Sequence, residues 1–481
     1  MRADFAKLDR AFNPKCVVVV GDSGFYQWLR GLSNFKGSKY SVQVNEQTGK
    51  DIEEKLKVKN YKTLLEVPES IDLAIVSVNR KYAMSVLDDL IKVNAAAAHF
   101  FTSGYSETNT EEGRQYEREL KARAEAANFH LIGPNCMGLY NPRVGIKQSG
   151  GQYDDSWGPV GFISQSGTHA INFGLEAHLQ GVDMAKSASF GNGIILDSAE
   201  FLDYFGQDND IKIIGMYLEG LRDGRRFMEV LKRVAKIKPV VVWKGGRTAS
   251  GARAIASHTG SLAVPYAIWE DAIRQFGGIP VKNMDEMVDT IKALMFVEPV
   301  VGNRVGLTGG SGGQSVAITD AFTEAGIDVP AFTKKTLDEL STFYNVIGGG
   351  MTNPIDTGNS NRMQLNRIMD IVEADENIDN VVLLMGLGMG SASTSGQDNI
   401  PGGVGAVTTL RKRSKKPVLA VVYSPFSAGG VQEARKTIKM LQEGRVPAFS
   451  TLERAAKALK NTMDYYLAKQ QNNVCSKSTN N

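Results

Sequence analysis

The sequence predicts an α/β protein with parallel sheets, spread over about three domains. Short apolar runs such as residues 17–20 alternate with helical patterns along the chain, which is typical of βα units and of a parallel sheet covered by helices on both faces. Glycine-rich turns join several strands to the helices that follow, for example at residues 21–25 and 309–313. The length of 481 residues corresponds to about three domains at roughly 150 residues each.

The composition excludes several classes of protein. The chain carries 55 Lys and Arg against 52 Asp and Glu, a net charge of +3, which is too balanced to indicate binding to nucleic acid or to a membrane surface. No stretch approaches the ~18 apolar residues of a membrane span, and residues 1–10 lack the apolar centre of a secretion signal. Three widely spaced cysteines, Cys16, Cys136 and Cys475, favour a reducing compartment. We therefore expect a cytoplasmic protein.

Residues 1–148 form the first predicted domain. Strands are expected at residues 17–20, 40–44, 73–78, 98–102 and 130–132, with helices such as 84–93 and 111–127 between them. Ligands of such sheets bind at the carboxyl ends of the strands, and the loops expected there are small and polar, which suits a phosphorylated nucleotide. Taken one by one, each loop could equally be an ordinary turn. The Gly-x-x-Gly spacing at residues 21–24 lacks the third glycine of the dinucleotide fingerprint, so NAD is not expected.

Residues 158–299 form the second predicted domain, after a segment, residues 148–158, that has no apolar period. A strand at 159–163 leads through a Ser- and Gly-containing turn into a helix at 169–179. Ser166, Gly167 and Thr168 are expected at the start of that helix, where free N–H groups bind anions. Further strands are expected at 185–190, 211–218 and 239–243, and further helices at 198–205, 224–236, 267–276 and 284–295.

A single histidine, His258, is the candidate reaction centre. It lies among small residues at 254–263, which we expect to form a loop between the strand 239–243 and the helix 267–276. Glu219, at the end of the strand 211–218, could accept a hydrogen bond from one imidazole nitrogen, fix the tautomer and leave the other nitrogen nucleophilic. The alternatives are a surface histidine without a task and an exposed strand-end carboxylate.

Residues 302–470 form the third predicted domain. A strand at 304–308, a glycine-rich turn and a helix at 314–325 repeat the arrangement of residues 159–179. Further helices are expected at 334–342, 363–374 and 452–469 and strands at 380–385 and 418–423, with a Gly/Ser-rich segment at 386–405. The polar residues 471–481 are expected to be disordered.

The turn of the third domain supplies a second helix start, at Gly312 and Gly313. Each helix start carries about half an elementary positive charge, and two of them could hold one phosphate. An imidazole between them could accept a phosphoryl group, since phosphohistidine carries two negative charges. The two helix starts, Glu219 and His258 thus favour phosphoryl transfer when they are considered together.

Four stretches carry a resemblance to a known family. They are GPVGFISQSGT at 158–168, YLEG at 217–220, ASHTGS at 256–261 and IGPNCMGLYNP at 132–142. Together they resemble the nucleoside-diphosphate-forming acyl-CoA synthetases, the relatives of succinyl-CoA synthetase, and most of all the α subunits of ADP-forming acetate–CoA ligases. The resemblance covers about residues 12–470. It implies a Rossmann-like CoA-binding domain followed by two flavodoxin-like ligase domains, the first with a phosphohistidine loop and the second with Asn353-Pro-Ile-Asp356.

The resemblance also implies a reaction and its residues. ATP phosphorylates His258, the phosphoryl group passes to a carboxylic acid, and the CoA thiol displaces phosphate from the acyl phosphate to give acyl-CoA, ADP and phosphate. Glu219 orients the histidine, and the helix starts at Ser166, Gly167, Thr168, Gly312 and Gly313 hold the phosphate. The implied CoA contacts are Gly21, Ser23, Asn45, Ser77, Ser103 and Gly104, with Asn135 near the thiol end.

All three predicted domains consist of βα units, which leaves no region for an ATP-grasp domain. ATP and Mg²⁺ are therefore expected to be bound mainly by a separate ATP-grasp β subunit, in an α2β2 hetero-oligomer, and no metal ligand is expected in this chain. Two other functions stay open: a CoA-binding regulatory or scaffold protein without turnover, and an acyl or carbamoyl transferase that uses an acyl phosphate made elsewhere. The sequence leaves the acid and the choice between ATP and GTP open.

Overall fold

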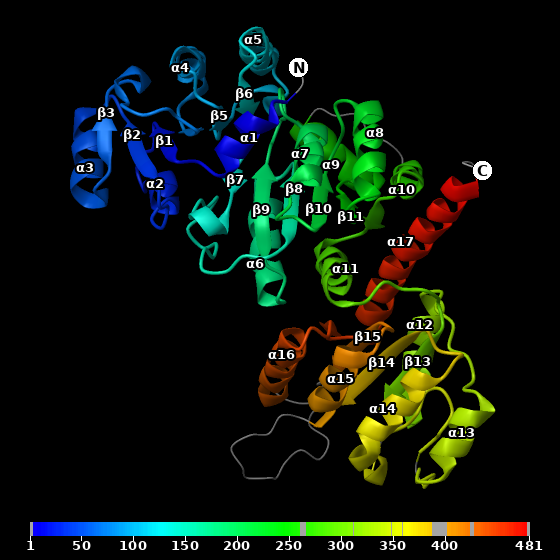
Figure 1. Ribbon diagram of the computed structural model, residues 1–481. Helices are drawn as coiled ribbons and strands as arrows, with labels where there is room; N and C mark the ends of the chain where they lie inside the picture. Colours follow the sequence, from blue (N-terminus) through cyan, green and yellow to red (C-terminus); the bar gives the residue numbers. More distant parts are fainter. Residues whose placement is uncertain are drawn as a thin grey trace. The chain divides into compact units, whose positions relative to one another are not determined.

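The computed structural model describes residues 3–259, 266–310, 312–347, 349–357, 359–386, 402–423 and 428–478. The chain divides into two compact units, Met1–Met284 and Asp285–Asn481. The first unit contains two six-stranded sheets and the second a four-stranded sheet (Figure 1). The α/β class with parallel sheets, expected from the sequence, is confirmed.

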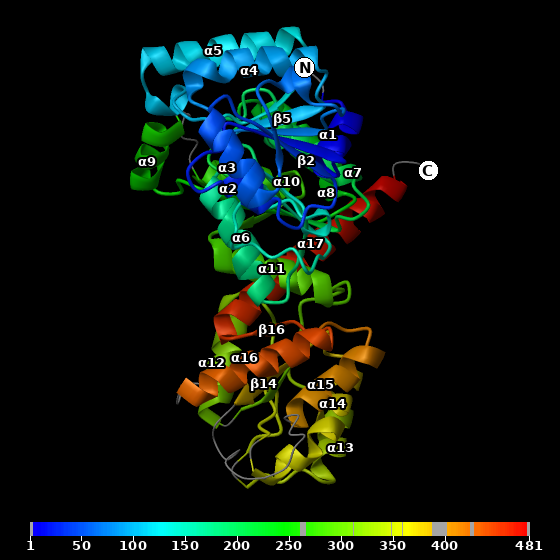
Figure 2. The same ribbon diagram turned by 90° about the vertical axis from the view of Figure 1, so that its left-hand side faces the viewer.

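The first sheet has the order β3-β2-β1-β4-β5-β6 and is parallel throughout, which is the Rossmann-like order. Its strands are β1 (Cys16–Val20), β2 (Ser38–Val42), β3 (Lys59–Tyr61), β4 (Leu73–Val76), β5 (Ala97–Phe100) and β6 (His130–Ile132). Its helices are α1 (Phe5–Phe12), α2 (Gln27–Gly31), α3 (Glu46–Leu56), α4 (Arg80–Lys92) and α5 (Glu111–Ala126), and α4 and α5 lie side by side (Figure 2). All five residues of β1 are buried, as a central parallel strand requires.

The second sheet has the order β12-β11-β10-β8-β9-β7. Its strands are β7 (Gly138–Tyr140), β8 (Val160–Ser164), β9 (Met184–Ser189), β10 (Ile213–Leu218), β11 (Val240–Lys244) and β12 (Ile279–Val281). Its helices are α6 (Gly167–Leu179), α7 (Ser198–Gln207), α8 (Gly224–Ala235), α9 (Ala249–Thr259) and α10 (Tyr266–Gln275). Only β7 pairs antiparallel. Counted from β8, the parallel strands follow the flavodoxin-like order 2-1-3-4-5.

The two sheets of the first unit share one hydrophobic core. The ring of Phe12 on α1 stacks on Tyr204 of α7, with centroids 5.3 Å apart and planes 15° apart. Strand β7 lies before residues 148–158, where we expected the boundary between the first two domains. It nevertheless pairs with β9 in the second sheet. Helix α1 and strand β7 therefore fasten the N-terminal part of the chain to the second sheet.

The segment around the candidate histidine differs from our expectation. We expected a loop at residues 254–263, but α9 extends from Ala249 to Thr259. Alanine is the strongest helix former, and four alanines occur in the sequence ASGARAIASHT of α9. Local helix propensity is therefore the reason why a stretch of small residues is helical here.

The second unit has the strand order β13-β14-β15-β16. Its strands are β13 (Val305–Gly309), β14 (Asn380–Gly386), β15 (Val418–Tyr423) and β16 (Ala448–Phe449). Its helices are α11 (Met284–Phe296), whose first residue closes the first unit, α12 (Gly312–Glu324), α13 (Lys334–Ser341), α14 (Leu365–Ala374), α15 (Gly402–Arg413), α16 (Ala428–Glu443) and α17 (Leu452–Ser478). A parallel bridge between Thr308 and Ile355 adds a neighbour to β13, so the order 2-1-3-4-5 recurs when this segment is counted second.

Helix α17 is longer than expected. It continues to Ser478, through most of the stretch that we expected to be disordered from residue 471. The side-chain amide of Gln470 donates to the carbonyl of Val300 at 3.2 Å, and adding residues to an existing helix costs little once it is nucleated. None of the helices in the described part of the chain combines the length and the hydropathy that a membrane-spanning helix requires.

Candidate functional site

Two topological switch points organise the first unit. In the first sheet, the strand order reverses between β1 and β4, and the loops after these strands carry Gly21, Ser23 and Ser77. In the second sheet, it reverses between β8 and β10, which are followed by Ser166 and Glu219. Open α/β sheets bind ligands at such points.

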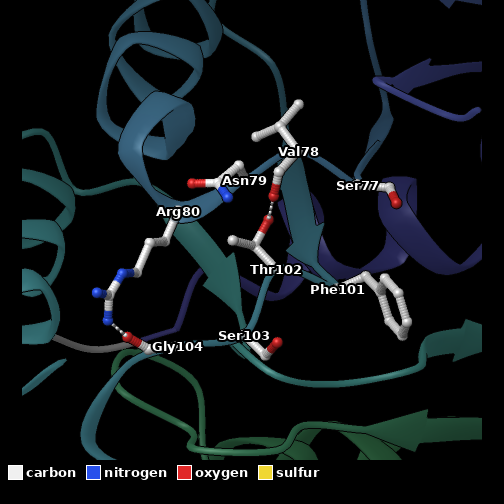
Figure 3. A pocket seen from close by; sticks show the side chains of 8 residues that line it. All are labelled: Ser77, Val78, Asn79, Arg80, Phe101, Thr102, Ser103 and Gly104. Atoms are coloured by element: carbon white, nitrogen blue, oxygen red, sulfur yellow. Dashed lines mark hydrogen bonds between the residues drawn. The ribbon is translucent and has the colours of Figure 1, made fainter. Parts of the chain in front are cut away.

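A cavity of about 300 Å³ lies at the carboxyl ends of β4 and β5 (Figure 3). Figure 3 shows the hydroxyl of Thr102 donating to the carbonyl of Val78, at 2.9 Å, and the guanidinium of Arg80 donating to the carbonyl of Gly104. The residues that line the cavity are Ser77, Val78, Asn79, Arg80, Phe101, Thr102, Ser103 and Gly104. Three of the residues implied for CoA, Ser77, Ser103 and Gly104, are therefore brought together in one cavity.

The loop after β1 lies beside this cavity. Gly21 has a φ of +81°, and a Cβ there would stand 2.8 Å from the carbonyl oxygen of Ser77, so a side chain would collide with the loop after β4. Asp22, whose importance the sequence did not reveal, accepts from the backbone N–H groups of Trp28 at 3.1 Å and Leu29 at 2.9 Å. Burial raises the pKa of Asp22, and these two hydrogen bonds oppose the shift.

Ser23 and Asn45 do not line the cavity. Ser23 is exposed at the tip of the loop after β1. Asn45 is the N-cap of α3, where its side chain accepts from the N–H of Thr48 at 2.9 Å. Capping alone accounts for an asparagine at this position.

Asn135 lies in the loop after β6 and contacts both sheets of the first unit. Its backbone N–H donates to Thr102 at 2.9 Å, and its φ of 57° is in the left-handed region that asparagine tolerates. The adjacent carbonyl of Pro134 accepts from the N–H of Asn192 at 3.0 Å. This loop therefore connects the wall of the cavity to the turn after β9.

Ser166 caps α6, as expected. Its hydroxyl accepts from the N–H of His169 at 3.4 Å, while Ser164 fixes the turn by donating to the carbonyl of Ser166 at 2.6 Å. Gly167 and Thr168 occupy the first turn of the helix, where N–H groups lack intrahelical acceptors. The helix start is thus suited to an anion.

Glu219 is half-buried at the end of β10, next to this helix start. The hydroxyl of Tyr217 donates to its carboxylate at 3.2 Å. The side-chain oxygen of Gln165 accepts from the backbone N–H groups of Glu219 at 2.8 Å and Gly220 at 3.0 Å. Gln165 directly precedes Ser166, so one short loop carries both the residue that caps α6 and the residue that accepts hydrogen bonds from Glu219 and Gly220. No local pattern in the sequence singles out Gln165.

Two further side chains at this site were not anticipated. The ammonium group of the buried Lys244 donates to the carbonyl of Glu219 at 2.7 Å, and burial lowers the pKa of Lys244. The centroid of the His169 ring lies 4.3 Å from that of Tyr217 and 4.6 Å from that of Trp243. Burial lowers the pKa of His169. The imidazole of His169 is therefore neutral near pH 7.

His258 belongs to α9, and its side chain lies outside the described part of the structure. The chain that leads to α9 starts beside Glu219, because a Cβ on Gly245 would stand 3.3 Å from the Cγ of Glu219. Gly312 and Gly313 begin α12 in the second unit. A Cβ on either of these two glycines would meet no atom of the described residues within 4 Å.

Comparisons with known proteins match two parts of this chain to family models. Residues 157–294 match the succinyl-CoA ligase-like flavodoxin domain, and residues 26–142 match a CoA-binding domain. The chain is similar to the α subunit of ADP-forming acetate–CoA ligase II of Pyrococcus furiosus, with 33% identity over 97% of this chain and 98% of the relative. It is similar also to the α subunit of isoenzyme I of the same organism, with 31% identity over 94% and 96%.

A solved structure extends the similarity to the whole fold. It is that of the dinucleotide-forming acetyl-coenzyme A synthetase 1 of Ca. Korarchaeum cryptofilum in complex with phosphate and ADP. The TM-score is 0.82 at 30% identity, over 96% of this chain and 97% of the other.

Proposed function

The chain belongs to the nucleoside-diphosphate-forming acyl-CoA synthetases, as a ligase of the α-subunit type, and from this premise we propose that His258 carries the phosphoryl group between ATP and a carboxylic acid. The observation that supports this proposal most is the clamp of Gln165 on Glu219, because it holds a carboxylate beside the start of α6. A carboxylate can orient an imidazole, and a helix start stabilises the negative charge of a phosphoryl group.

Each bond change has a place in this proposal. The imidazole of His258 attacks the γ-phosphorus of ATP and ADP leaves, while the carboxylate of Glu219 accepts a hydrogen bond from the other ring nitrogen. The acid oxygen then attacks phosphorus and the P–N bond breaks, which gives an acyl phosphate. Finally the CoA sulfur attacks the acyl carbon and phosphate leaves. The start of α6 at Ser166, Gly167 and Thr168 stabilises the phosphate charge, as does the start of α12 at Gly312 and Gly313.

CoA binds at the switch point of the first sheet in this scheme. Ser77, Ser103 and Gly104 line its cavity, Gly21 lets the loop after β1 approach, and Ser23 and Asn45 contact CoA from the rim. The thiol end reaches Asn135, between the two sheets of the first unit. The relatives are named for acetate, which makes a short aliphatic acid the first substrate class to test.

A partner completes the enzyme. Two relatives that match this chain over nearly the whole length of both chains are named α subunits, which supports a β subunit as the partner of this chain. We assign ATP and Mg²⁺ to an ATP-grasp domain of this partner, in an α2β2 assembly in the cytoplasm. The division into domains at 1–148, 158–299 and 302–470 belongs to the same proposal.

Phosphorylation from labelled ATP tests the function. With a β subunit and γ-labelled ATP, the wild-type chain should acquire an acid-labile, alkali-stable phosphate, and His258→Ala should acquire none. His178→Ala is the matched control, since His178 pairs with Asp183 at 2.7 Å away from Glu219, and it should be labelled like the wild type.

The alternatives predict other outcomes of this experiment. CoA binding without label under any condition would indicate a regulatory or scaffold protein. Formation of acyl-CoA from a supplied acyl phosphate by His258→Ala, at the wild-type rate, together with an unlabelled wild type, would indicate a transferase.

A further inference from the structure

Four polar side chains form a continuous network that starts at the cavity at the ends of β4 and β5, which we call the CoA cavity after its proposed ligand. The network ends at the loop that follows Glu219. We call Glu107, Glu117, Asn192 and Arg222 the Asn192 network. The amide of Asn192 donates to the carboxylates of Glu107 at 2.8 Å and Glu117 at 2.9 Å. Arg222 donates from Nε to the carbonyl of Asn192 at 2.9 Å and from Nη2 to Glu117 at 3.1 Å.

One end of the network holds the wall of the cavity. The carboxylate of Glu107 accepts from the backbone N–H groups of Gly104 at 2.6 Å and Tyr105 at 3.1 Å. On its other side, the carbonyl of Gly104 accepts from Arg80. Because Gly104 lines the cavity, its position depends directly on Glu107.

The other end holds the loop after β10. Arg222 stands three residues after Glu219, whose own N–H donates to Gln165 at 2.8 Å. The loop is therefore fixed at its start by Gln165 and near its end by Arg222. A shift of Arg222 would change the direction in which this short loop leaves the strand.

The centre of the network is an ion pair between a shielded carboxylate and a partly exposed arginine. The side chain of Glu117 is 12% exposed and that of Arg222 43% exposed. Burial raises the pKa of Glu117, but hydrogen bonds from Ser106 and Asn192 together with the charge of Arg222 outweigh it and lower the pKa. Glu117 is thus ionised at neutral pH, and its charge-assisted bond to Arg222 is of the strong kind. Loss of Arg222 leaves the shielded carboxylate of Glu117 without its ion-pair partner.

We propose that Arg222, Asn192 and Glu117 are positioning residues that couple occupancy of the CoA cavity to the placement of Glu219, and hence to phosphorylation of the histidine. The proposal rests on the proposed function, in which CoA fills the cavity and Glu219 orients His258. CoA that contacts Gly104 moves or fixes Glu107, and the Asn192 network passes this change to the loop of Glu219. Coupling of this kind is reciprocal, so phosphorylation changes the affinity for CoA by the same factor.

The test measures the phosphorylation equilibrium in the complex with the β subunit. The labelled fraction of the chain is determined at a fixed ratio of ATP to ADP, without carboxylic acid, with and without saturating CoA. We expect CoA to change the equilibrium constant of the wild type by roughly 5- to 150-fold. In Arg222→Lys and Glu117→Gln, the ratio of the equilibrium constants with and without CoA should be close to one, because neither variant can keep the paired hydrogen bonds.

A matched control separates coupling from general damage. Arg123→Lys changes an arginine that is 42% exposed and that pairs with Asp88 at 2.6 Å from the same helix as Glu117, and it should keep the wild-type ratio. Asn192→Asp provides a second route into the network, since it keeps the size of the side chain but opposes Glu107 and Glu117 with a like charge. It is measured in the same way if Arg222→Lys does not fold.

The outcomes distinguish this proposal from the function on which it rests. A wild type that is labelled but insensitive to CoA, or network variants that keep the wild-type ratio, would overturn the coupling alone. A wild type that takes no label at all would overturn the proposed function and the coupling with it.

Discussion

Gln165 shows how much of the site depends on a single side-chain oxygen. This oxygen accepts hydrogen bonds from two backbone N–H groups, those of Glu219 and Gly220. Without it these donors lose their acceptor, and an unsatisfied buried donor costs about 1–3 kcal/mol. The residue also places Ser166 and Glu219 at a fixed spacing.

We therefore expect Gln165→Ala to slow phosphorylation of the chain by roughly 10- to 100-fold, since small misplacements of catalytic groups have effects of this size. The rate is measured with the β subunit and labelled ATP. Gln207→Ala is the control, because Gln207 is exposed and its side-chain amide donates to Asp203, on the same helix, at 3.1 Å. An unchanged rate in Gln165→Ala would show that the loop of Glu219 holds its position by other contacts.

His99 gives the first unit a pH dependence of known sign. The side chain is 1% exposed, and neither ring nitrogen has a hydrogen-bond partner within the described structure. Burial lowers the pKa of His99 to about 3, whereas the unfolded chain has an ordinary pKa of about 6.5. Between these two values the unfolded state binds a proton that the folded state does not, so the free energy of unfolding falls as the pH is lowered from about 6.5 towards about 3.

We expect this histidine to remove roughly 1.4 kcal/mol of stability per pH unit below about 6. Urea unfolding at pH 7 and pH 5 measures the loss. In His99→Leu the loss between the two pH values should be smaller by this contribution, whatever the substitution does to packing at pH 7. Equal losses in the two proteins would mean that His99 is protonated in the folded state.

The sequence predicted the role of a site residue only where that role follows from the residue's own place at the start of a helix or the end of a strand. Ser166 was expected at the start of a helix and caps α6, and Ser77, Ser103 and Gly104 were expected at strand ends and line one cavity. Gln165 contacts Glu219 across 54 positions, and Asn192 contacts Glu107 across 85. Such pairs are created by the strand order, which no local pattern contains.

At the scale of elements, α1 has a larger role than its eight residues indicate. Phe12 is fully buried and packs against Tyr204 at 5.3 Å and Phe205 at 5.5 Å, both on α7. Phe12→Ala should lower the free energy of unfolding by about 3–5 kcal/mol, the usual loss for a buried phenylalanine. Phe25→Ala is the control, because Phe25 is 92% exposed, and its effect should stay within about 0.5 kcal/mol. Denaturant unfolding measures both, and similar effects would contradict the role of α1.

Most strands could be predicted from the sequence to within two residues, because parallel strands buried on both faces are continuous apolar runs. The strand β15 was predicted with its observed limits. Several of the elements that were not predicted are short or polar, such as β7, β12, α1 and α3, and the longer helices α15 and α16 were not predicted either. Short or polar elements are stabilised mainly by tertiary packing. For α9 the expected loop was wrong because the alanines outweigh the other small residues.

At the scale of the whole molecule, the sequence predicted three βα regions, and the described residues form three sheets. The order of strands within each sheet followed from the family resemblance and not from periodicity, since pairing between distant strands leaves no local pattern. The grouping of the first two sheets into one compact unit was not anticipated. It results from a hydrophobic core that both sheets share, from the pairing of β7 with β9, and from polar contacts such as those of Asn192 with Glu107 and Glu117.

The division into two compact units predicts how CoA affects unfolding. A ligand stabilises only the cooperative unit that binds it, by about 2.7 kcal/mol at a concentration 100 times its dissociation constant. Calorimetry of the chain should therefore show two transitions, and CoA should raise the Tm of one of them by on the order of 5 °C. That transition is the one lowered by Phe12→Ala, because Phe12 and the cavity lie in the same unit, Met1–Met284.

Ser103→Glu places a carboxylate in the cavity against an anionic ligand, and it should abolish the shift while leaving the other transition unchanged. A single transition that CoA shifts as a whole would show that the units unfold together.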